Sequence, residues 1–190
     1  MNRKYMVLPA VLVVAAAVVA VVQLWPSTLK DLRAKNLCLG MLTEETAGLL
    51  HDGKGGALAV DEGTADGSAS DPVFTTTCFV NRDPEGSAAQ RLQYALVVRP
   101  ANALGEPAED AVPVGHGHSG WIGPRESEVQ LPDSCARPMR TSAPHITVTL
   151  KIAPGTLVKE DGKTFDLISK SRTVLLECID NLTRQYDCAG

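Results

Sequence analysis

The sequence predicts an α+β fold class, in which an N-terminal transmembrane helix precedes a small antiparallel sheet that two helices cover and disulfides staple. Three observations support this prediction. A strongly hydrophobic run lies near the N-terminus, alternating strand-like segments lie between two segments of helical spacing, and all five cysteines follow the hydrophobic run. With 190 residues, the chain has room for one domain beyond that run.

The hydrophobic run covers residues 5–25, of which 19 out of 21 are hydrophobic and none is charged. This length matches the roughly 20 residues that cross a hydrocarbon core. Arg3 and Lys4 precede the run and Trp25 ends it, which favours a cytoplasmic N-terminus. A cleaved secretory signal peptide is the alternative interpretation. The expected organisation is a cytoplasmic N-terminus at 1–4, a transmembrane helix at 5–25, a stalk at 26–36 and an extracytoplasmic domain at 37–190.

The net charge of the chain indicates which classes of partner it can bind. The formal net charge is −4, and the expected extracytoplasmic part is more acidic still because Arg3 and Lys4 precede the span. Such a surface is a poor match for nucleic acid. The expected partners are the membrane, through residues 5–25, and a protein or cell-envelope component, and no cofactor is expected.

Two helices are predicted, one at each end of the domain. Thr43 has the side chain of a helix N-cap, two glutamates follow it, and Gly53 is a suitable terminator for a helix through Leu50. The second helix extends from about Thr164 to Gln185, where apolar residues recur at helical spacing.

The segments between these helices alternate between apolar and polar residues, as half-buried strands do. Residues 74–81 and 91–99 predict an antiparallel hairpin, because residues 82–87 between them contain Asp, Pro and Gly. Further strands are expected at 145–152 and, more briefly, around Leu58 and at 128–131, whereas 100–120 is expected to be a long loop. The polar residues on one face of each strand place both helices on the opposite face.

The five cysteines are expected to form two disulfides, because exported cysteines usually pair. Cys178 lies on the apolar stripe of the second helix, where an unpaired thiol packs as a small hydrophobe, and we expect it to stay free. Pairing Cys38 with Cys78 and Cys135 with Cys188 is the preferred arrangement for the others. No two cysteines lie close enough in sequence for the paired ligands of a structural zinc site.

Four motifs lie along the expected domain. They are Leu37-Cys38-Leu39-Gly40, Cys78-Phe79-Val80, Trp121 followed by Leu131-Pro132 and Cys135, and a closing helix that ends in Cys188. With these motifs the chain resembles a group of small, uncharacterised, membrane-anchored exported proteins of high-GC actinobacteria. The resemblance spans most of residues 37–188 and implies the same architecture and the two disulfides, but no activity.

One local cluster suggests chemistry, the run Gly115-His116-Gly117-His118-Ser119-Gly120. Two histidines one residue apart can share a metal, but a third ligand is not evident from the sequence. Ser119 lacks the glycine two residues later, and the preceding strand, that a nucleophile elbow requires. A solvated glycine-rich loop is therefore the preferred interpretation, and a metal-binding protein or hydrolase centred on His116, His118 and Ser119 is the alternative function.

Trp121 and Ile122 are flanked by glycine and proline, so they are candidates for an exposed apolar tip that contacts a partner, although Trp121 also suits a core position. No catalytic constellation is evident. The sequence therefore predicts a single-pass, membrane-anchored, extracytoplasmic module that is non-enzymatic and binds a protein or cell-envelope component.

Overall fold

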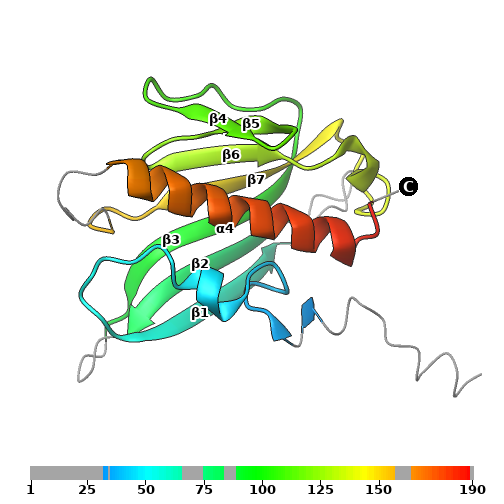
Figure 1. Cartoon of the computed structure of the whole chain (residues 1–190). Helices are drawn as coiled ribbons and strands as arrows, with labels where there is room; N and C mark the ends of the chain where they lie inside the picture. Colours follow the sequence, from blue (N-terminus) through cyan, green and yellow to red (C-terminus); the bar gives the residue numbers. More distant parts are fainter. Residues whose placement is uncertain (1–31, 34, 66–74, 84–88, 157–163, 189–190) are drawn as a thin grey trace, which may run out of the picture.

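The computed structural model describes residues 32–33, 35–65, 75–83, 89–156 and 164–188. Seven strands form a single antiparallel sheet in the order β1-β2-β3-β7-β6-β5-β4 (Figure 1). The strands are β1 (Ala57–Ala65), β2 (Thr75–Asp83), β3 (Arg91–Ala101), β4 (Val112–Gly115), β5 (His118–Ile122), β6 (Glu126–Gln130) and β7 (His145–Ile152). The helices are α3 (Glu44–Ala47), the 3-10 turn η1 (Asp133–Cys135) and α4 (Thr164–Gln185). The α+β class is thus confirmed.

Two meanders meet at the centre of the sheet. Strands β1 to β3 form the first meander, β4 to β7 form the second, and β3 pairs with β7 from Tyr94↔Ile152 to Ala101↔His145. The predicted hairpin of residues 74–81 and 91–99 is therefore confirmed as β2 and β3, with Cys78 opposite Leu96. The connection from β3 to β4 joins the middle of the sheet to its far edge.

Helices α3 and α4 lie on the same face of the sheet, as the alternation of polar residues predicts (Figure 1). Long helix α4 crosses that face, and its buried side chains pack on the inward-facing residues of the strands. These residues form one core that includes Val80, Tyr94, Leu96, Val148, Leu150, Leu175 and Ile179. The boundaries predicted for the last helix and for the strand at 145–152 match α4 and β7.

The helix expected from Thr43 to Leu50 is much shorter than predicted. Helix α3 has four residues and ends at Gly48, although Thr43 caps it by accepting a hydrogen bond from the Thr46 N–H at 3.3 Å. Its last carbonyls are occupied from outside, since Tyr94 Oη donates to the Ala47 carbonyl at 3.0 Å and Arg82 donates to the Gly48 carbonyl at 3.3 Å. The next helical turn would need these acceptors. Tertiary contacts therefore override the local helix signal.

The long loop expected over residues 100–120 is also incorrect, because β4 and β5 form there. Strand β4 has four residues, and one of them is Pro113, which cannot donate to a ladder. The position of β4 at the sheet edge makes Pro113 tolerable. Propensity is too weak to reveal such a strand, which depends on pairing with β5.

The predicted transmembrane helix at 5–25 falls outside the described residues. Within the part of the chain that the structure describes, no helix has the length and hydrophobicity needed to cross a membrane.

Candidate functional site

The histidine cluster forms the turn between β4 and β5. Gly115 pairs with His118, and both intervening residues have positive φ, 55° at His116 and 78° at Gly117. Two positive φ values in succession are typical of a two-residue hairpin turn, which explains the glycine-rich sequence. Across the described residues, no group of three or more His, Cys, Asp or Glu side chains is placed to hold a metal ion. The motif is thus accounted for by backbone geometry.

Gly120, the last glycine of this cluster, is required by a close approach of two strands. It has a φ of 147°, and a Cβ at this position would lie 2.3 Å from the carbonyl oxygen of Glu128 on β6. Any side chain would push β5 away from β6. This glycine therefore serves strand pairing, and it gives no support to a nucleophile elbow at Ser119.

Trp121 and Ile122 point to opposite faces of β5. Ile122 is completely buried in the core, so a direct partner contact by this side chain does not fit the structure. Trp121 is half-buried on the face without helices, where its Nε1 donates to the Gly105 carbonyl at 3.1 Å. The Gly105 N–H donates in turn to Glu128 at 2.7 Å, so these two bonds hold the β3–β4 connection against the sheet. A partner contact through Trp121 remains a prediction.

The cysteines are arranged as the sequence predicts. Disulfides join Cys38 to Cys78 and Cys135 to Cys188, and Cys178 is free and buried. Burial raises the pKa of the Cys178 thiol, and the neighbouring Glu177 carboxylate raises it further. Cys178 is therefore held as an uncharged thiol that packs in the core. This form is unreactive, since the thiolate is the nucleophile.

An apolar pocket of about 240 Å³ is lined in part by residues within four positions of each disulfide, and we call it the disulfide-flanked pocket. Its lining residues come from the C-terminal end of α4, from β1, β2, β3 and β7, from the segment after η1 and from the first described residues of the chain. Its apolar lining is Leu39, Met41, Val98, Met139, Ile146, Leu182 and Tyr186, and its polar lining is Arg33, Thr64, Thr76, Arg99 and Gln185. Pockets that bind small molecules have this character, with mostly apolar walls and a few polar groups.

One wall of the pocket is the tight loop that carries Leu39 and Met41. The backbones of Leu37 and Leu42 bond to each other across its base, and Cys38 and Leu39 adopt left-handed conformations with φ of 57° and 56°. Left-handed backbone at consecutive residues other than glycine costs free energy and persists only where surrounding contacts impose it. Three neighbouring elements supply such contacts to this loop.

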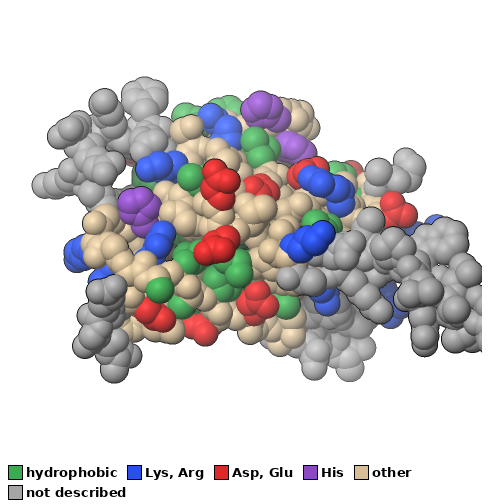
Figure 2. Space-filling model, turned by 60° about the horizontal axis from the view of Figure 1, so that its bottom comes forward, with side chains coloured by type: hydrophobic (Ala, Val, Ile, Leu, Met, Phe, Trp, Pro, Cys, Tyr) green, Lys and Arg blue, Asp and Glu red, His purple; other side chains and the backbone are tan. Residues whose placement is uncertain are grey.

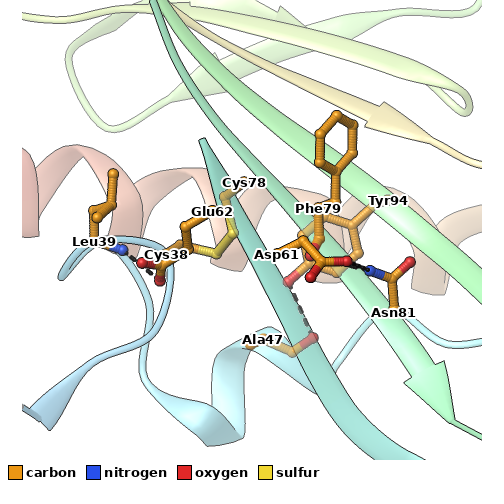
Figure 3. The surroundings of a disulfide bond; sticks show 9 residues. All are labelled: Cys38, Leu39, Ala47, Asp61, Glu62, Cys78, Phe79, Asn81 and Tyr94. Carbon is orange, nitrogen blue, oxygen red and sulfur yellow. Dashed lines mark hydrogen bonds between the residues drawn. A yellow bond between two sulfur atoms is a disulfide. The ribbon is translucent and has the colours of Figure 1, made fainter. Parts of the chain in front are cut away.

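The loop is held by β1, β2 and α4 together. Glu62 of β1 accepts the Leu39 N–H at 2.8 Å, and Cys78 of β2 forms the disulfide with Cys38 (Figure 3). From α4, Asn181 donates to the Met41 carbonyl at 2.9 Å and Gln185 donates to the Leu39 carbonyl at 3.3 Å. The wall is thus preorganised, which lowers the entropic cost of binding a ligand.

Another part of the lining is fixed by the second disulfide and by the turn that ends α4. Asp187 has a φ of 51°, and the Cys188 N–H bonds back to the Thr183 carbonyl at 2.9 Å, so the helix ends in a tight left-handed turn. This turn directs Cys188 toward Cys135, four residues before Met139. The disulfide thereby ties together the two segments that carry the lining residues Met139 and Tyr186.

Gln185, one of the lining residues, has a buried polar atom without a partner. Gln185 is 4 % exposed, and its Oε1 accepts no hydrogen bond from the described residues, although its Nε2 is bonded to Leu39. A buried acceptor left unpaired costs about 1–3 kcal/mol. A ligand in the pocket that donates a hydrogen bond would satisfy this oxygen after a shift of the Gln185 side chain, because the oxygen is shielded from solvent in this structure.

A second depression, of about 570 Å³, is open to solvent and lies beside α3. Its lining is mainly charged, with Glu44, Glu45, His51, Arg82 and Lys170 around Leu49 and Leu58. Figure 2 shows acidic and basic side chains interspersed around hydrophobic ones on the face turned toward the viewer. This open and mixed surface lacks the enclosure that favours the disulfide-flanked pocket as the candidate site.

Sequence reasoning did not identify the disulfide-flanked pocket. Its twelve lining residues come from separate segments between Arg33 and Tyr186, and no two of them form a recognisable motif. The one signal in the sequence is the pair of disulfides, whose ends lie within four residues of Leu39, Met41, Thr76, Met139 and Tyr186.

Comparison with known protein families, with curated proteins and with solved structures found no match.

Proposed function

We propose that this protein is an extracytoplasmic binding module, held at the membrane by residues 5–25, whose disulfide-flanked pocket binds an apolar chain. The observation that carries the proposal is the pocket itself, because its apolar space is bordered by segments that disulfides and hydrogen bonds fix, and Gln185, which has an unpaired acceptor, is among its lining residues. Met41 and Met139 in its lining suit a flexible apolar ligand, since methionine side chains adapt to irregular shapes.

The extracytoplasmic location is supported by the two disulfides, because oxidising compartments preserve such bridges. The uncharged run at 5–25 and the basic residues before it support a single-pass topology with a cytoplasmic N-terminus. A reporter enzyme that is active only outside the cytoplasm, fused after Gly190, is therefore expected to be active. An inactive reporter at full expression would contradict this topology.

Binding of an apolar chain is tested by photolabelling. Full-chain protein in nanodiscs is irradiated with a long-chain alcohol that carries a diazirine near the end of its chain, and labelled peptides are mapped by mass spectrometry. Thr76 lines the pocket from β2, and the variant Thr76→Phe fills it with a ring that a strand position accommodates. We expect label on peptides that contain Met139 or Leu182 in the native protein, and at least about tenfold less label on them in Thr76→Phe.

The matched control is Arg125→Ala. Arg125 is exposed, and its carbonyl accepts the Ile152 N–H at 2.8 Å, so it lies at the opposite end of β7 from Ile146 and the pocket. This variant should label as the native protein does. Label confined to residues 1–31, or equal label in Thr76→Phe, would refute the proposed function.

A further inference from the structure

The disulfide-flanked pocket has a cationic rim. Arg33 and Arg99 are among its lining residues, and within the described part of the chain no aspartate or glutamate is. The Arg99 guanidinium lies 3.8 Å from the buried carboxylate of Glu128, which partly neutralises the positive charge of Arg99. Arg33 is exposed, which leaves it as the cation best placed to meet an anionic group at the mouth.

The backbone brings Arg33 to the pocket and fixes its position. Its Cγ and backbone nitrogen lie against Gly40, where a Cβ would come within 3.3 Å of either atom. Gln185 Oε1 lies on the same side, 3.4 Å from that Cβ position. The backbone nitrogen and Cγ of Arg33 and the unpaired Gln185 Oε1 therefore lie around the same glycine.

The chain also limits how far the pocket can lie from the membrane. Arg33 lies eight positions after Trp25, at the end of the expected span. An extended chain of this length reaches at most about 29 Å. The mouth of the pocket is therefore within reach of the surface of the same membrane that residues 5–25 cross.

We infer that the ligand is a single-chain anionic membrane lipid with a hydroxyl next to its headgroup. This inference rests on the proposed function. The chain would lie among Met41, Met139 and Leu182, the hydroxyl would donate to Gln185 Oε1, and the anionic group would pair with Arg33. A volume of about 240 Å³ is below the roughly 300–1,000 Å³ of typical ligand pockets, which favours part of one chain over two.

The test compares lysolipids that differ in one group. Full-chain protein is released from non-ionic detergent micelles for native mass spectrometry with lysophosphatidylglycerol, with lysophosphatidylcholine of the same chain length, and with lysophosphatidylglycerol methylated at its sn-2 hydroxyl. We expect the anionic lipid to bind at least about tenfold more tightly than the zwitterionic one, because hydrogen bonds to charged groups are the strong ones. Methylation should weaken binding about threefold or more, since Gln185 Oε1 is then left unpaired.

The variant Arg33→Gln removes the positive charge of Arg33 and keeps a polar side chain at this position. It should bring the anionic and zwitterionic lipids to nearly equal affinity, whereas Arg125→Ala, which removes an exposed arginine at the far end of the sheet, should keep the tenfold difference. An unchanged difference in Arg33→Gln would overturn the inference. Displacement of the lipid by free glycerol 3-phosphate would also overturn it, because the headgroup alone would then be the ligand.

Failure of this inference and failure of the proposed function give different results. If all three lysolipids bind equally and Thr76→Phe abolishes their binding, the pocket is an apolar-chain site but the preference for an anionic lipid is contradicted. If Thr76→Phe leaves binding intact, the lipid binds elsewhere on the protein, and both this inference and the proposed function are contradicted.

Discussion

Replacing Cys188 with serine is expected to lower the free energy of unfolding by about 4 kcal/mol, because the bridge to Cys135 closes a loop of 53 residues. For a chain of this size, a loss of that magnitude lowers the melting temperature by roughly 8–16 °C. The bridge ties the end of α4 to the segment that carries Met139. Its loss should therefore also speed hydrogen exchange in the last turns of α4, where chain ends otherwise fray.

The matched control is Cys178→Ser, which changes a buried cysteine that forms no disulfide. Placing a hydroxyl in the core should cost about 1 kcal/mol or somewhat more. Thermal unfolding of the full chain in detergent, with non-reducing peptide mapping, measures both variants. Equal destabilisation of the two variants, or two intact bridges in Cys188→Ser, would contradict the assignment.

The long-range pairing of the cysteines was predictable because each cysteine is marked by its local context. Cys178 lies on the buried stripe of a long amphipathic helix, and Cys188 follows the end of that helix. The strands with regular alternation, β2, β3 and β7, were equally evident. In each of these cases burial of one face dominates the free energy, and burial leaves a periodic trace in the sequence.

The errors occur where tertiary contacts decide the structure. Helix α3 ends early because Tyr94 and Arg82, distant in sequence, bond to its last carbonyls. Strand β4 includes Pro113 and exists through its pairing with β5. Neither partner is visible in a local window of sequence, so local signals predicted a longer helix and a loop.

The disulfide-flanked pocket could not be predicted for a related reason. A cavity is set by what several segments leave empty, and no residue of the lining is unusual in its own segment. Gln185 illustrates this, because it reads as one more polar residue near the end of a helix. Only its burial and its unpaired Oε1 distinguish it.

The central claim, that the disulfide-flanked pocket holds an apolar chain in the native membrane, is tested most directly by what the protein retains on purification. Full-chain native protein, Thr76→Phe and Arg125→Ala are extracted from native membranes, washed in the same detergent and analysed for bound small molecules by mass spectrometry. We predict close to one amphiphile per chain in the native protein and in Arg125→Ala, and at least about tenfold less of it in Thr76→Phe. The same molecules in equal amounts from all three proteins, or none from any of them, would contradict the claim.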